Sequence, residues 1–228
     1  MIDYKIEFYD KFLMLRRIIN KESSINFEWA KNAGCGRFSL ILARKFDDYE
    51  DVVDFNNMVK IYVNDELWYT GFIENFTPSL STEEQVNIVG VGYIEQLNWS
   101  DTTWVYSNFE ISELVKYILK LRVETDKLDI IVKDENFDDT TFSIDQIVFQ
   151  NQKTKDCIQI LRDLVRYYDY GVDEKREFYF KSINQDADLW DVAVWDVSLW
   201  ERNEPKVWVF PKRYLELYEP IYSVFNHL

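Results

Sequence analysis

The sequence is poor in the residues that carry most enzyme chemistry. Its 228 residues include one histidine, His227, and two cysteines, Cys35 and Cys157. The cysteines are far apart and each lies among apolar residues, so we expect ordinary buried thiols and no disulfide, zinc or redox site. A single histidine near residue 228 also argues against a Ser-His-Asp or Cys-His site. We therefore expect no enzyme, no cofactor and no metal.

Glycine and proline are also scarce, with six and four residues, which argues against low-complexity linkers. No Walker loop or GxGxxG pattern is present. The stretch AGCG (33–36) precedes a strand pattern, so it predicts a turn and not a phosphate cradle. No apolar run approaches the roughly 18 residues that cross a bilayer, so we expect no membrane insertion. The opening MIDYKIEFYDKF is charged and mixed, so we expect no signal peptide there and synthesis in a cytoplasm.

Basic residues are outnumbered. Lys and Arg total 26 against 41 Asp and Glu, a formal charge of −15. Such a surface repels nucleic acid, so no stable nucleic-acid binding is expected. An acidic surface suits a protein past which DNA must move without binding. A role in solubility alone is the other explanation. Acidic runs such as 45–54 and 133–139 are typical of solvated loops. Asp186, Asp188 and Asp191 faintly resemble a calcium loop, but the central Gly and terminal Glu of an EF-hand are missing.

The abundant residues are aromatic. Phe, Trp and Tyr make up 17% of the chain, which favours strands and large contact surfaces. Alternating or continuous apolar patterns predict a series of short strands, with a hairpin connection at 64–66. These strands are expected at 4–10, 24–30, 37–43, 58–63, 67–76 and 84–93. The series predicts a small β-barrel-like domain over residues 1–104.

The pattern then changes to helical spacing. A helix is predicted over 107–121, with Ser107 as cap, and a second over 154–171, with Gly171 at its C-terminus. A strand at 128–134 and a hairpin around Glu174 complete a small α/β domain, 105–183. Residues 184–228 return to strand-like, aromatic-rich sequence and are predicted to form a C-terminal extension. The fold class predicted is α+β, mainly β.

The extension contains LWDVAVWDVSLWE (189–201), in which Trp190, Trp195 and Trp200 recur every five residues. This period is far shorter than that of a WD repeat. In a strand it places apolar groups on both faces. We interpret the segment as an arm whose tryptophans pack between domains or against a neighbouring subunit. An intradomain core and a sugar-binding platform are the alternatives.

Three stretches together resemble one protein family. The segment 26–48 contains a Gly-Cys-Gly turn followed by RFSLIL and an acidic run. Residues 56–97 continue with VKIYV, an aromatic-x-Gly strand and VNIVGVGY. Residues 153–181 contain a helix, a glycine and VDEKREFYF. In this order they resemble phage tail hub proteins of the baseplate or tail tip, in the late-control-protein superfamily. The positions that match the turns and bends of the family are Gly34, Cys35, Gly36, Gly71 and Gly92, and none of them is catalytic.

The resemblance covers roughly residues 24–183 and departs from the family after that. Full hub proteins carry two barrel domains per chain, whereas only 45 residues follow the predicted α/β domain here. That is too few for a second barrel. Three explanations are open. The extension adds strands to shared sheets, a partner supplies the missing barrel, or six copies of the chain form the ring in place of three.

The resemblance implies a structural protein of a virion tail, with an acidic surface lining a DNA channel. Its implied partners are copies of itself, as a trimer or hexamer, and other tail proteins. These are a tail tube or distal tail protein, a tape-measure protein, and a spike or fibre. An aromatic-rich glycan-binding module for host recognition is the alternative function. A cell-wall hydrolase is a third class, for which we find no nucleophile or metal set.

Overall fold

The computed structural model describes residues 4–20, 23–31, 33–42, 53–78, 85–165 and 167–183. Strands dominate and two α-helices follow in the second half, so the predicted α+β, mainly β class is confirmed. The elements are β1 (Tyr4–Tyr9), β2 (Leu15–Ile19), β3 (Ser23–Ala30), β4 (Gly34–Leu42), β5 (Met58–Val63), β6 (Glu66–Pro78), β7 (Val86–Gly92), η2 (Tyr93–Asn98), β8 (Asp101–Glu110), α1 (Ile111–Asp126), β9 (Ile131–Phe137), β10 (Ser143–Lys153), α2 (Thr154–Asp163), β11 (Tyr168–Val172) and β12 (Glu177–Ser182).

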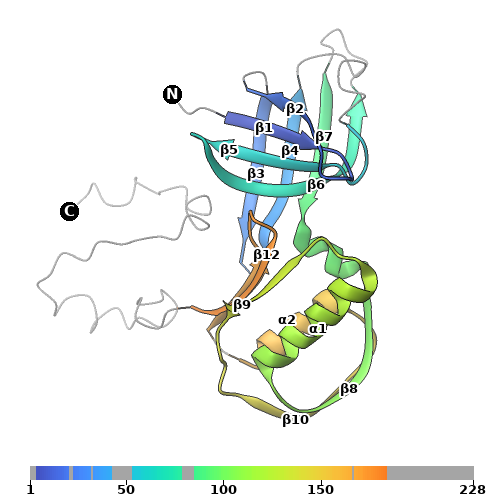
Figure 1. The fold of residues 1–228 in the computed structure, drawn as a ribbon, viewed down its shortest axis with the longest axis vertical. Coiled ribbons are helices and arrows are strands. Elements are labelled where there is room, and N and C mark those ends of the chain that lie inside the picture. Colours follow the sequence, from blue (N-terminus) through green and yellow to red (C-terminus); the bar gives the residue numbers. More distant parts are fainter. Residues whose placement is uncertain are drawn as a thin grey trace, which may run out of the picture.

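The first seven strands belong to one sheet, in the order β2-β1-β5-β6-β7-β4, with β3 paired to β4. Neighbouring strands in this part are antiparallel. Figure 1 shows β1 and β5 crossing over β3 and β4, as in a barrel. In the described residues, no ladder joins β2 to β3. The predicted barrel-like domain is therefore a strongly folded sheet that is not closed.

Alternating side chains build the first core. Phe38, Leu40 and Leu42 of β4 are buried, and Ile6 and Phe8 of β1 lie in the same cluster. Successive residues of a strand point to opposite faces, so this spacing directs one face of each strand inward. The predicted hairpin at 64–66 is confirmed, with Asn64 and Asp65 in the left-handed region at φ 50° and 64°. Asn and Asp tolerate that conformation better than other non-glycine residues.

The second core lies around the two helices. It contains Leu114, Val115 and Ile118 from α1, and Cys157 and Ile158 from α2. The strands β8 and β10 pair as a separate two-stranded sheet beside them. Figure 1 shows these two strands running around the helices. The main sheet closes the other side of this core, because Tyr170 and Val172 of β11 and Phe178 of β12 belong to the same cluster.

Both predicted helices exist with different bounds. Ser107 does not cap the first helix, because β8 continues to Glu110 and Glu110 itself is the N-cap of α1. The second helix ends at Asp163, and Gly171 lies in β11 instead of capping a helix. The ladder between β8 and β10 explains the first difference, because pairing with Ser143–Lys153 holds residues up to Glu110 extended.

The two halves of the described chain are joined through the main sheet. A parallel pair between Val172 of β11 and Gly34 of β4 continues the sheet into β11, β12 and β9. Phe72 and Val91, from β6 and β7, also pack into the second core. The predicted boundary at 104/105 lies inside β8. The predicted third region, 184–228, lies outside the described residues.

Candidate structural junction and interaction surface

The predicted turn residues meet at the seam between the two halves. Gly34 has φ +74°, and a Cβ there would lie 2.3 Å from the carbonyl oxygen of Val172. Glycine is required both by the left-handed backbone and by this approach. The amide of Val172 donates to the carbonyl of Ala33 at 3.1 Å. The absence of a side chain at Gly34 therefore lets β11 dock on β4.

The other four residues lie close behind Gly34. Gly71 and Gly92 are register partners on β6 and β7. A Cβ on Gly92 would lie 1.9 Å from the carbonyl oxygen of Cys35, which leaves no room for any other residue. The carbonyl of Gly36 accepts a hydrogen bond of 2.7 Å from the buried Tyr69 hydroxyl. The five positions thus form one glycine junction (Gly34, Cys35, Gly36, Gly71 and Gly92), where the backbones of β4, β6, β7 and β11 approach one another closely.

The turn between β11 and β12 also contacts the first half of the described chain. The hydroxyl of buried Thr70 on β6 donates to the carbonyl of Glu174, between β11 and β12. Arg176 lies over the ring of Tyr93 at 5.5 Å. Asp173 accepts amide hydrogen bonds from Lys175 and Glu177 at 2.9 and 2.8 Å, which order the turn. Burial raises the pKa of the Asp173 carboxyl to about 6.

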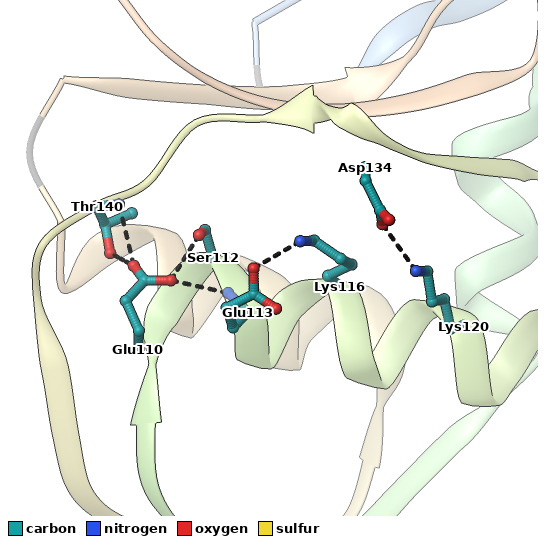
Figure 2. A network of polar contacts seen from close by, with 7 residues as sticks. All are labelled: Glu110, Ser112, Glu113, Lys116, Lys120, Asp134 and Thr140. Atoms are coloured by element: carbon teal, nitrogen blue, oxygen red, sulfur yellow. Dashed lines mark hydrogen bonds and ion pairs between the residues drawn. The ribbon is translucent and has the colours of Figure 1, made fainter.

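Glu110 organises the polar side of the helical part (Figure 2). Its carboxylate accepts the amide of Glu113 at 2.9 Å and the hydroxyl of Ser112 at 2.5 Å. It also accepts the amide of Thr140 at 3.0 Å, so one side chain caps α1 and holds the loop before β10. Further along α1, Lys120 contacts Asp134 of β9 at 2.7 Å. Every charged group in this network has a structural partner, so the network positions α1 against β9 and the loop before β10.

The two cysteines are buried, as expected, and both are free. Burial raises the pKa of the Cys35 thiol well above its usual range and that of Cys157 to about 11. Both are therefore protonated at neutral pH and poor nucleophiles. Within the described ranges, no group of three or more His, Cys, Asp or Glu side chains could hold a metal ion. His227 and the candidate calcium residues Asp186, Asp188 and Asp191 lie outside those ranges.

The turn between β1 and β2 presents an apolar surface that the sequence analysis missed. Phe12, Leu13, Met14 and Leu15 are exposed by 73%, 43%, 62% and 48%. We call residues 12–15 the apolar tip. The signal was present as four consecutive large apolar residues between Lys11 and Arg16. The predicted interface residues Trp190, Trp195 and Trp200 lie outside the described residues.

In the part of the chain that the structure describes, neither helix is long and apolar enough to cross a bilayer.

Comparison with known proteins gives a structural match and no sequence match. No protein-family model matches the chain. No curated protein matches it either. Among solved structures, the 43 kDa tail protein of prophage MuSo2 from Shewanella oneidensis has a TM-score of 0.57 at 14% identity over 78% of this chain. Prophage tail protein gp18 from Listeria monocytogenes has a TM-score of 0.53 at 12% identity over 79% of this chain.

A tail protein from Neisseria meningitidis has a TM-score of 0.54 at 9% identity over 78% of this chain. The chain covers 54%, 50% and 50% of these three structures, so it spans about half the length of each. At these identities the likeness concerns the fold alone. The described chain has the fold of part of these three tail proteins, two of which come from prophages.

Proposed function

We propose that the chain is a structural component of a phage or phage-like tail. In this role it forms a hub or tail-tip ring that joins the tail tube to distal tip proteins and surrounds part of the DNA channel. The observation that carries the proposal is the fold, which three tail proteins share over 78–79% of this chain. Its partners would be copies of itself, as a trimer or hexamer, and neighbouring tail proteins.

The charge and the exposed surface support this role. A net charge of −15 disfavours DNA binding, as a channel that releases DNA requires. Four consecutive exposed apolar residues at the apolar tip are unusual on a monomer and typical of a protein contact. We also propose that the chain has no catalytic activity of its own, because its polar networks hold elements together and its cysteines are protonated.

Native mass spectrometry of the full chain tests the proposal, alone and with the tail proteins encoded beside it. A closed ring of three or six copies is expected, with the same symmetry in micrographs of the tail. A chain that stays monomeric in the presence of those proteins would contradict the ring. Electron microscopy with an antibody against the chain locates it in the virion, where labelling is expected at the end of the tail tube.

A glycan-binding module is the second candidate, because two tryptophans are largely exposed. Trp99 is 56% exposed beside Phe72, at a ring distance of 5.2 Å, and Trp104 is 66% exposed on β8. Flat aromatic faces of this kind can stack on sugar rings. A glycan array with the full chain separates the two functions. Specific binding that disappears in a Trp104→Ala variant favours this candidate, whereas a ring without glycan binding favours the tail structural role.

A further inference from the structure

The apolar tip is held in a fixed shape by Asp10. The carboxylate of Asp10 accepts the amides of Phe12 and Met14, both at 2.9 Å, and it pairs with Arg16 at 2.6 Å. The amide of Leu13 donates to the carbonyl of Asp10 at 2.9 Å, and Leu13 has φ 61°. A leucine in the left-handed region costs folding energy, which this turn accepts while leaving its side chains in water. A preformed apolar loop binds a partner with little loss of conformational entropy.

The charge around the apolar tip limits the chemistry of a partner. Residues 4–20 carry four basic and two acidic side chains, a net charge of +2, in a chain whose total is −15. The hairpin is therefore a basic and apolar region on an acidic protein. Complementary partners are acidic and apolar in the same short stretch, because opposite potentials steer association and apolar burial stabilises it.

The chain itself contains such a stretch. Residues 184–201 carry five acidic side chains and no basic one, a net charge of −5. Large apolar residues alternate with these acids, among them Trp190, Trp195 and Trp200. We propose that the apolar tip of one copy binds residues 184–201 of a neighbouring copy. This interaction rests on the proposed ring, to which it assigns a contact.

The neighbouring copy comes from the proposed ring, and the sheet order fits a contact between copies. The segment follows β12, whereas the apolar tip adjoins β2, and six strands separate β12 from β2 in the sheet. A contact from near one end of the sheet to the other end is also head-to-tail, the type that generates rings.

Cross-linking between two differently labelled preparations tests this contact in the full chain. One preparation carries Met14→Cys and a size tag, and the other carries Ala193→Cys. The native cysteines are buried and do not compete. After mixing and mild oxidation, a disulfide-linked mixed dimer is expected to form at least about tenfold faster than from unbound chains, because binding raises the effective concentration of the two thiols. A Val148→Cys preparation, whose position is 49% exposed on β10, replaces Met14→Cys as the matched control.

The outcomes separate this inference from the proposed function. Mixed dimers that form only with Met14→Cys, and less in a Lys11→Glu background, support the contact. Equal yields from Met14→Cys and Val148→Cys overturn it. A double Met14→Cys, Ala193→Cys chain that forms only an intrachain disulfide would show that residues 184–201 come from the same chain, and would overturn the contact between copies. If native mass spectrometry detects a ring while no 14–193 product forms, the inference fails and the ring stands. Mixed dimers without a ring support the contact and count against the ring.

Discussion

The glycine junction and the apolar tip belong to the same sheet but differ in their side chains. At the junction, missing side chains allow backbones to meet, and Gly92 has no space for even one carbon before the carbonyl of Cys35. At the apolar tip, large side chains extend into water from a turn that contains no glycine. The junction is complete within one chain, whereas the apolar tip leaves its side chains exposed.

This contrast predicts that substitutions in the two regions change different properties, namely stability and assembly. Gly34 lets β11 dock on β4, and Gly71 and Gly92 let β4, β6 and β7 approach one another, so we expect their substitution to act on stability. Residues at the tip contribute little to either core, because neither contains them. If the proposed contact holds, their substitution is expected to act on assembly. Four substitutions test the contrast, and their expected effects on the free energy of unfolding decrease in the order given below.

Gly92→Ala is expected to have the largest effect. The new Cβ would lie 1.9 Å from the backbone oxygen of Cys35, and backbone on both sides cannot move without breaking the pairing of β4, β6 and β7. We expect a loss of about 3 kcal/mol or more in the free energy of unfolding, measured by urea denaturation. Gly36→Ala is the matched control within the junction, because this glycine faces a side chain instead of backbone. Its Cβ would meet the flexible side chain of Glu28 at 2.6 Å, so a far smaller loss is expected. Equal losses would contradict the junction.

The sequence predicts most of the strands that alternate in burial. Residues 37–43 correspond to β4, and 58–63 match β5. The strands β2, β8 and β10 were not predicted. β8 is exposed at most positions and buries only Thr102 and Tyr106, four residues apart, so period-two burial is absent and the periodic signal fails.

The site was predictable in part. The glycines and Cys35 were identified as turns and bends, but their convergence depends on tertiary pairing between β4 and β11. Gly171 was predicted as a helix cap, yet it lies in β11, where a Cβ would meet the amide nitrogen of Gly34 at 2.4 Å. Local sequence cannot distinguish a glycine needed for its own dihedral angles from one needed by a strand distant in sequence.

Glu110→Ala should have the second largest effect. This substitution removes the cap of α1 and the partner of the Thr140 amide at once. A lost N-cap costs about 1 kcal/mol, and the unpaired buried amide adds to it, so about 1–2 kcal/mol is expected in urea denaturation. Glu113→Ala on the same helix is the control, since its side chain is 60% exposed and pairs with Lys116 alone. A loss for Glu113→Ala as large as for Glu110→Ala would contradict this role of Glu110.

Asp173→Asn tests the hairpin turn at the junction through pH. The folded pKa is raised to about 6 from an ordinary 3.8, so the fold favours the protonated acid. The stability from this group is full below pH 3.8 and is lost as pH rises through about 6. Asparagine stays neutral and can still accept both amide hydrogen bonds. The free energy of unfolding of the variant, compared with that of the parent, should therefore be higher at pH 7 than at pH 4. We expect a gain below about 1 kcal/mol, because solvent screens the partly exposed carboxyl. An identical pH dependence in variant and parent would rule out this origin.

Phe12→Ser should have the smallest effect on folding and the most selective effect on assembly. The ring is 73% exposed and belongs to neither core, so the free energy of unfolding should change by less than about 0.5 kcal/mol. Ring formation, measured by native mass spectrometry over a range of concentrations, should require a higher concentration than in the parent. Phe55→Ser is the matched control, because Phe55 is 55% exposed but lies 5.3 Å from the Phe76 ring in the first half of the chain. Unchanged assembly in Phe12→Ser would contradict a role of the apolar tip in the interface. A large loss of stability would show that the ring of Phe12 contributes to the fold.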